Sequence, residues 1–103
     1  MGLRFEWDKR KADSNLKRHG VSFQEATSVF ADTLSITIPD PDHSASEARF
    51  LDLGLSHRNR LLAVSYTERG EIIRIISARR ASRSERKNYE NKTHQTQEKP
   101  ETE

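Results

Sequence analysis

Arginine side chains are concentrated at the end of the stretch that is apolar enough to form a central β-strand, IIRIISARR from Ile72 to Arg80. Cleaving RNA without a metal requires a base that removes the 2′-hydroxyl proton, a cation beside the scissile phosphate and an acid for the leaving oxygen. Arginine suits the second role because its planar guanidinium is always charged and binds phosphate through two hydrogen bonds. The best-placed candidates are Arg74, Arg79 and Arg80.

The same arginines have a simpler interpretation, the solvated basic edge of a sheet. Further cations follow at Arg83, Arg86 and Lys87, and for these a solvated helix surface is the favoured interpretation. Only Glu71 and Glu85 offset the positive charge in this region. Positive charge is thus clustered where the predicted strand ends, as expected of a protein that binds phosphate groups.

Histidine is the residue that most readily exchanges a proton near neutral pH. His43 has the acidic neighbours Asp40, Asp42 and Glu47, and such carboxylates favour its protonated form. Two roles are open for His43, an acid or base in catalysis and the ordering of its loop. Glu47 and Arg49 can pair across the same loop.

Two other kinds of site are weaker interpretations. The D-x-D-H-x3-E spacing of the acidic loop could hold a metal, but the spacing is loose and no second ligand group accompanies it. We therefore expect no metal and no other cofactor. The segment around HGVSF predicts a helix-turn-helix in the geometric sense only, because neither helix carries several base-reading side chains.

The N-terminal third must supply elements that cover a sheet. Its pattern predicts a short strand over 3–7, a helix over 8–18 that presents Ala12 and Leu16 to the core, and a second helix over 22–32. An aspartate and a Ser-x-x-Glu capping box precede the two helices, and a glycine follows the first.

From residue 34 onward the apolar side chains recur with a period of two, which predicts strands joined by turns. We expect one apolar face, covered by the two helices. Its members are Ile36, Ile38, Leu51, Leu53, Leu55, Leu62, Val64, Ile73 and Ile75. The other face, where a ligand could lie, would show Phe50, Asp52, Ala63, Ser65, Thr67, Ile72, Arg74 and Ile76.

A second capping box at Ser82 begins a final helix that is predicted to end near Asn91, with Tyr89 as its apolar anchor. The residues that follow contain no aliphatic side chain, which favours disorder. We therefore expect a single domain over 1–91 and a disordered tail over 92–103.

The composition limits the class of protein. Hydrophobic residues make up 32% of the 103-residue chain and charged residues 33%, with a net charge of +2 and a pI near 9.2, which permits an anionic partner. The absence of cysteine excludes disulfides and thiolate zinc sites. No apolar run is long enough for a membrane span, and the N-terminus does not resemble a signal peptide. We expect a soluble, cytoplasmic protein.

Several segments, in this order, resemble the BrnT family of type II toxin–antitoxin toxins: FEWD, KRHGVSFQEA, VFAD, PDHSASEAR, LGLS and IRIISARRASRSERKNYE. The resemblance covers about residues 3–90. It implies an α+β fold related to the RelE toxins, with two N-terminal helices on one face of a small antiparallel β-sheet and a short C-terminal helix. It also implies an endoribonuclease that cuts RNA through 2′-hydroxyl attack and thereby inhibits translation and growth.

The resemblance further implies a BrnA-like antitoxin whose ribbon-helix-helix part binds operator DNA, so that the toxin reaches DNA only through its partner. The catalytic positions it implies are His43, Glu47, Arg49, Arg74, Arg79 and Arg80, together with Ser77 as a motif position. Which of these is the base stays open, because RelE-like enzymes distribute that role over different residue types. The alternative function is a non-catalytic RNA-binding or protein-interaction domain on the same scaffold.

Overall fold

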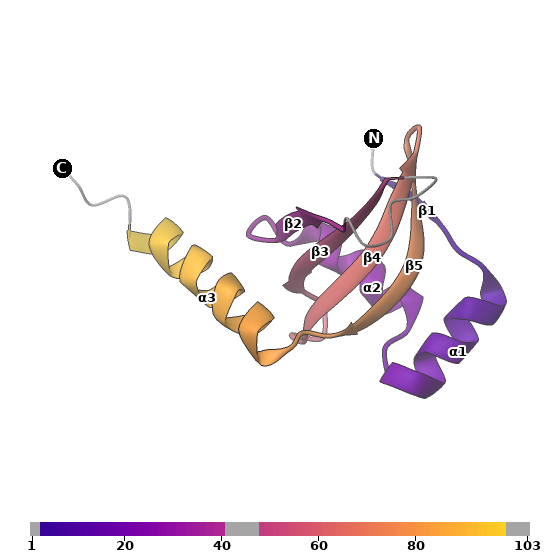
Figure 1. The fold of residues 1–103 in the computed structure, drawn as a ribbon, viewed down its shortest axis with the longest axis horizontal. Coiled ribbons are helices and arrows are strands. Elements are labelled where there is room, and N and C mark those ends of the chain that lie inside the picture. Colours follow the sequence, from indigo (N-terminus) through magenta and orange to yellow (C-terminus); the bar gives the residue numbers. More distant parts are fainter. Residues whose placement is uncertain (1–2, 41–47, 99–103) are drawn as a thin grey trace.

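The structure is a computed structural model that describes residues 3–40 and 48–98 (Figure 1). It has an α+β fold, in which the strands form one sheet and the helices are arranged around it. No helix in the described part of the chain is long and apolar enough to cross a membrane. In chain order the elements are β1 (Arg4–Glu6), α1 (Lys9–His19), α2 (Phe23–Ser28), the 3-10 turn η1 (Val29–Ala31), β2 (Ile36–Pro39), β3 (Arg49–Leu55), β4 (Leu61–Arg69), β5 (Ile72–Arg80) and α3 (Arg83–Glu98).

The five strands form one sheet in the order β1-β5-β4-β3-β2. Strands β2 to β5 pair antiparallel, whereas β1 runs parallel to β5, with Arg4 opposite Ile72 and Glu6 opposite Arg74. The prediction of an antiparallel sheet is therefore wrong at this edge. Two parallel strands must be joined by a long crossover connection. Here the chain from α1 to β4 forms that connection. Alternation within a strand carries no information about the direction of its neighbour.

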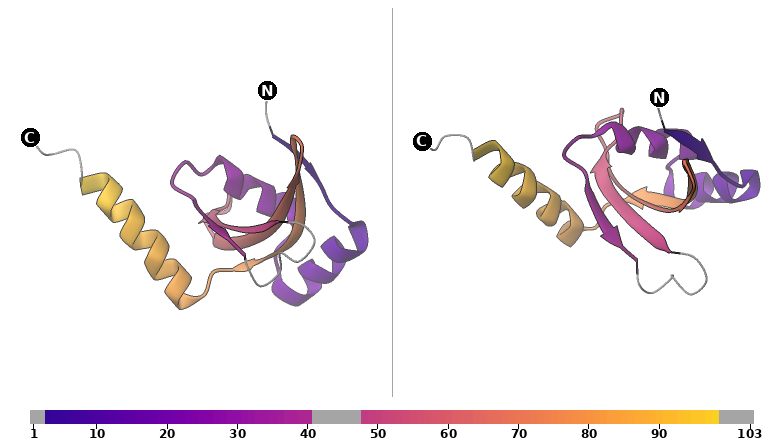
Figure 2. Two further views of the ribbon diagram at one scale, coloured as in Figure 1. Left: turned by 45° about the horizontal axis from the view of Figure 1, so that its top comes forward. Right: turned by 90° about the horizontal axis from the view of Figure 1, so that it is seen from above.

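The larger core lies between the sheet and α2 with η1, which cover one face (Figure 2). Helix α1 lies beside the outer edge of β5, beyond the point where the pairing with β1 ends. Aromatic rings close the core in edge-on contacts, such as Phe30 with Tyr66 at 5.0 Å between ring centroids. The buried members of this cluster are Val21, Phe23, Ala26, Val29, Leu62, Val64, Tyr66, Ile73, Ile75 and Ala78.

The predicted single apolar face is wrong, because the strand register divides its members between both sides of the sheet. Leu53 lies opposite Ala63, whereas Leu62 lies opposite Gly54. Leu53 therefore points away from α2, to what we call the distal face, where it forms a second core cluster with Leu61, Ala63 and Tyr89. Period-two alternation determines which residues of one strand share a face, but not how two strands are matched.

A β-bulge in β5 also changes the expected faces. Ser65 pairs with Ser77 but Tyr66 pairs with Ile75, so Ile76 is an extra residue. Strict alternation would put Arg74 on the opposite face from Ser77 and Arg79. The bulge instead brings all three to the distal face.

Helix α1 has the predicted caps. Asp8 accepts hydrogen bonds from the backbone N–H groups of Arg10 and Lys11, and Gly20 ends the helix in the left-handed region at φ 71°. The buried residue on this helix is Asn15, however, and the predicted core residue Leu16 is 49% exposed.

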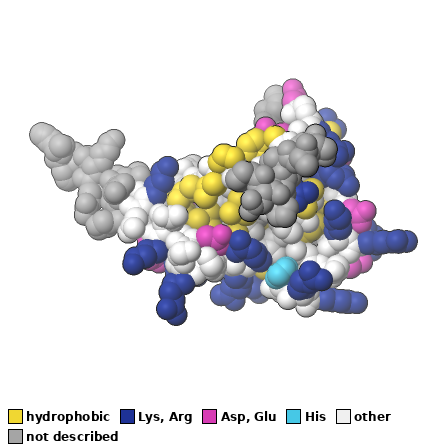
Figure 3. All heavy atoms as spheres, in the orientation of Figure 1, with side chains coloured by type: hydrophobic (Ala, Val, Ile, Leu, Met, Phe, Trp, Pro, Cys, Tyr) yellow, Lys and Arg dark blue, Asp and Glu magenta, His cyan; other side chains and the backbone are white. Residues whose placement is uncertain are grey.

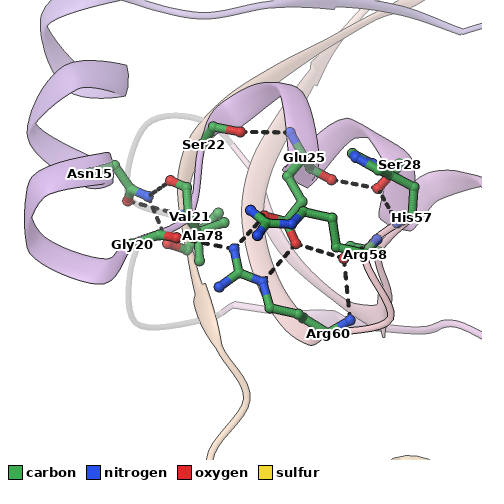
Figure 4. Close-up of polar contacts among 11 residues, drawn as sticks. Asn15, Gly20, Val21, Ser22, Glu25, Ser28, His57, Arg58, Arg60 and Ala78 are labelled. Carbon is green, nitrogen blue, oxygen red and sulfur yellow. Dashed lines mark hydrogen bonds and ion pairs between the residues drawn. The ribbon is translucent and has the colours of Figure 1, made fainter.

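Asn15 is buried because its amide satisfies backbone groups in two places, the loop before α2 and strand β5 (Figure 4). Its Nδ2 donates to the carbonyl oxygens of Val21 at 2.9 Å and Ala78 at 2.8 Å, and its Oδ1 accepts from the Ala78 N–H at 3.1 Å. The side chain thus pairs the outer edge of β5 in place of another strand. This arrangement holds α1 in a defined position beside β5.

Helix α3 begins with the predicted capping box, since Glu85 N donates to Ser82 Oγ and Ser82 N donates to Glu85 Oε1. The helix projects from the sheet and runs to Glu98, past the predicted end near Asn91 (Figures 1 and 2). The helix thus extends over residues 92–98 of the predicted tail, and the domain boundary at residue 91 stays a prediction. Tyr89 anchors α3, because its ring is buried against the distal face and its hydroxyl donates to Asp32 Oδ2 at 2.6 Å.

Candidate active site

A cavity of about 360 Å³ opens on the distal face where β3, β4 and β5 lie side by side. Its wall combines two cations, two serine hydroxyls and an acidic residue, a composition suited to an anion. The two serines are cross-strand partners on β4 and β5, next to the bulge at which the pairing register shifts by one residue. The lining residues are Pro39, Asp40, Arg49, Leu51, Ser65, Ser77 and Arg79.

Arg79 is held in place by a bidentate ion pair with Glu85. Its Nη1 lies 2.8 Å from Glu85 Oε1 and its Nη2 3.0 Å from Oε2, while Nη1 also donates to the Arg80 carbonyl oxygen at 3.3 Å. Hydrogen bonds from Arg79 lower the pKa of Glu85 to about 2, and the same contact raises the pKa of Arg79. The guanidinium has about five N–H donors, so some remain for a phosphate. The Arg79 side chain is 41% exposed and accessible to such a ligand.

Arg49 forms the opposite wall and lies at one end of the acidic loop. The backbone N–H of Asp40 donates to the Arg49 carbonyl oxygen at 2.8 Å, so both ends of the loop meet at the cavity. His43 and Glu47 belong to residues 41–47, which lie outside the described residues. Their candidate roles are therefore untested.

The other two candidate arginines lie apart from the cavity. Arg74 is on the distal face, but its Nη1 pairs with Glu6 Oε2 of β1 at 3.0 Å, and Arg69 lies 3.9 Å from the same oxygen. Arg80 is exposed and lies opposite Leu62, on the face that α2 covers. The structure thus brings Arg49 and Arg79 together and separates them from Arg74 and Arg80.

The metal interpretation has no support in the part of the chain that is described. Within residues 3–40 and 48–98, no three His, Asp or Glu side chains gather at one point. Asp42, His43 and Glu47, which the interpretation needs, lie outside that part. The described wall offers guanidinium and hydroxyl groups, which favour an anion over a cation.

A second polar cluster, centred on the buried carboxylate of Glu25, is not among the predicted sites (Figure 4). The Glu25 carboxylate is bound by the Arg60 guanidinium and accepts from Ser56 Oγ at 2.7 Å, and Arg58 approaches it at 3.8 Å. The Arg60 hydrogen bonds lower the pKa of Glu25. The only sequence signal at Glu25 is the capping box with Ser22. The structure contains this cap, because the Glu25 backbone N–H donates to Ser22 Oγ at 3.0 Å. Because these partners satisfy its carboxylate, we assign the cluster to holding α2 on the β3–β4 turn.

Asp52 is also buried, on the α2 side of the sheet, although strand parity predicts that it lies on the ligand face. Burial raises its pKa to about 6, and the Thr37 hydroxyl lies 3.4 Å from its Oδ1. The pKa of Tyr66 is raised by the burial of its own side chain and by the nearby charge of Asp52. Neither residue lines the distal cavity.

Comparison with known proteins identifies relatives of this chain. Residues 7–85 match the family described as "Ribonuclease toxin, BrnT, of type II toxin-antitoxin system". The crystal structure of the Brucella abortus ribonuclease toxin BrnT is similar, with a TM-score of 0.62 and 22% sequence identity. The alignment covers 80% of this chain and 100% of that one, so it shows a shared fold. No curated protein matches the sequence.

Proposed function

Because the chain belongs to the BrnT family of ribonuclease toxins of type II toxin–antitoxin systems, we propose that it cuts RNA in the distal cavity. The observation that carries this proposal is the placement of Arg79. It is a preorganised guanidinium, aligned by Glu85, in a cavity whose other walls are Arg49 and two serine hydroxyls. Preorganised donors of this kind stabilise charge that develops on a phosphate during reaction.

The proposed reaction needs no metal. A base takes the proton of the 2′-hydroxyl, the O2′–P bond forms as the P–O5′ bond breaks, and an acid protonates the departing 5′-oxygen. The products are a 2′,3′-cyclic phosphate and a 5′-hydroxyl. Arg49 and Arg79 hold the phosphate, and the hydroxyls of Ser65 and Ser77 donate to its oxygens.

We assign the proton transfers to the acidic loop. His43 and Glu47 are the candidates because both ends of that loop meet at the cavity wall. We leave Arg80 out of the phosphate site because it faces the other side of the sheet, and Arg74 contributes charge at a distance because Glu6 already binds it.

The proposal is tested by comparing Arg79→Ala with Arg80→Ala. The two residues are adjacent and carry the same charge, but only Arg79 lines the cavity. With RNA in EDTA, Arg79→Ala should lower the cleavage rate by roughly 10²-fold, the scale for removing one preorganised donor. Arg80→Ala should cleave at a rate close to that of the parent, and mass spectrometry should find 2′,3′-cyclic phosphate ends.

Thermal unfolding of both variants separates chemistry from folding, because Arg79→Ala also removes a partner of Glu85. RNA that stays intact with the folded parent protein would instead favour the alternative of a non-catalytic RNA-binding domain. Equal activity of the two variants would remove Arg79 from the site.

The family also leads us to propose neutralisation by a BrnA-like antitoxin. Such a partner silences the protein most simply by covering the surface around Arg79 with opposite charge. Expression of this chain alone should arrest growth by inhibiting translation in the cytoplasm, and co-expression of the antitoxin should restore growth. Normal growth at verified soluble expression would argue against the toxin function.

A further inference from the structure

Helix α1 carries a row of cations that the proposed cleavage reaction does not use. The row consists of Arg10, Lys11, Lys17 and Arg18, all exposed. Among the described residues none of these four forms an ion pair, in contrast to Lys9, which lies 3.9 Å from Asp13 on the same helix. Space-filling spheres show basic side chains gathered over the α1 end of the molecule (Figure 3). A surface of unpaired cations is an electrostatic attractor for an anionic polymer.

These cations border two open, shallow depressions along α1, which together we call the groove. A cavity of about 290 Å³ lies between α1 and β5, and a second of about 570 Å³ continues along α1. The second is lined by three cations and Ser14 together with one carboxylate, Asp13, which Lys9 approaches at 3.9 Å. Ser77 lines the first of these cavities and also the distal cavity that contains Arg79. The groove and the proposed active site therefore meet at β5.

The groove has a defined geometry because Asn15 joins α1 to β5 through two hydrogen bonds with Ala78, next to Ser77. The bulge at Ile76 is the other determinant, since it turns Ser77 toward the distal face while leaving it at the edge of the groove. The helix backbone that carries these cations is thus held at a fixed position relative to the Arg79 cavity.

We propose that this groove binds the phosphate backbone of the RNA strand on one side of the scissile phosphate. This inference rests on the proposed function, which places the scissile phosphate in the Arg79 cavity. From there the RNA strand would pass over Ser77 onto α1. RNA is favoured over a protein partner because Ile76 is the only aliphatic side chain in the wall of the first cavity. A protein interface would need an apolar centre.

The test measures binding of 2′-O-methyl RNA, which lacks the attacking hydroxyl, so that its result does not depend on cleavage. Fluorescence anisotropy is measured with strands of about 16 and about 4 nucleotides, the range that single-strand binding folds cover. The variant is Arg10→Ala with Arg18→Ala. The matched control is Arg86→Ala with Lys87→Ala, which removes the same charge from the exposed side of α3.

We expect the α1 variant to bind the long strand roughly tenfold more weakly at low salt, and its slope of log affinity against log salt to be smaller by about 1.4, the value for two lost phosphate contacts. Binding of the short strand should not change, because that strand does not reach beyond the cavity. The α3 control should behave as the parent for both strands. Arg10→Lys with Arg18→Lys should restore the long-strand affinity.

Equal losses in the α1 and α3 variants would overturn the proposal, because they would indicate attraction by net charge alone. An unchanged salt slope in the α1 variant would overturn it as well, and so would a loss of antitoxin binding with RNA binding intact, which would make the groove a protein interface. Cleavage that fails in the parent while the α1 effect on binding persists would overturn the proposed reaction and not the groove.

Discussion

The chain has two basic regions that differ in how their cations are held. On the distal face, Arg79 is aligned by Glu85 and Arg74 by Glu6, both through side-chain ion pairs. On α1, Arg10 and Arg18 have no such partner in the described part of the chain. A paired arginine has less rotamer freedom to lose when it binds, and it presents its remaining donors at one point. Unpaired cations suit a contact that needs charge but little geometry.

The largest difference between the two regions should appear when an arginine in each is replaced by lysine. Arg79→Lys keeps the charge but loses the planar fork, so we expect cleavage to fall by roughly 10²-fold. Arg18→Lys keeps the point charge that a backbone phosphate needs, so affinity for long RNA should stay at the parental level. Single-turnover kinetics and anisotropy measure the two quantities. Equal tolerance at the two positions would contradict the difference between the regions.

Removing the partner that aligns Arg79 should have the next largest effect. Glu85→Gln keeps the capping box but removes the charge, so the guanidinium gains freedom and cleavage should fall by roughly tenfold. Glu90→Gln, an exposed carboxylate on the same helix, is the matched control and should not alter the rate. A Glu85→Gln protein that cleaves as fast as the parent would show that Arg79 does not need alignment.

Low pH should reduce the stability contributed by the Arg79–Glu85 ion pair on the distal face. It should not affect the unpaired cations of α1. The ion pair with Arg79 lowers the pKa of Glu85 in the folded protein to about 2 from its ordinary value of 4.5, so its contribution to stability is present above pH 4.5 and is lost as the pH falls toward 2. We expect Glu85 to contribute on the order of 2 kcal/mol to this change. Denaturant unfolding between pH 2 and 5 should show a shallower pH dependence for Glu85→Gln. The α1 variant should keep the parental dependence.

The smallest effect should come from the C-terminal end, which belongs to neither basic region. Deleting residues 92–103 removes the part of α3 beyond its anchor Tyr89. Stability, cleavage and antitoxin binding should be nearly unchanged, as measured by thermal unfolding, RNA cleavage and co-purification. Loss of the complex would show instead that this end of α3 is a binding segment.

Much of the local structure and the family could be predicted from the sequence. The caps at Asp8, Gly20, Ser22 and Ser82 are confirmed, because each depends on residues within one helical turn. The resemblance to the BrnT family is also confirmed, by the match over residues 7–85. Of the candidate site residues, Arg79 and Arg49 were named from charge and motif and lie at one cavity, a proximity that the sequence could only suggest.

Contacts between distant segments were decided by the tertiary structure. Periodicity predicts Leu16 in the core and gives no sign that Asn15 is buried. The Asn15 amide is buried because it pairs the edge of β5 at Ala78, which is 63 residues away in the sequence. The buried carboxylate of Glu25 likewise depends on Arg60, which no local pattern connects to it.

The sequence by itself determined the types of elements, their helix caps and the basic character of the chain, because these follow from neighbouring residues. Only the tertiary structure decided which cations lie together. The bulge at Ile76 turns Ser77 and Arg79 to the same face as Arg74, and the parallel pairing of β1 supplies the Glu6 that occupies Arg74. Both features arise from strand register, which is set by packing across the whole sheet and not by the alternation of side chains along one strand.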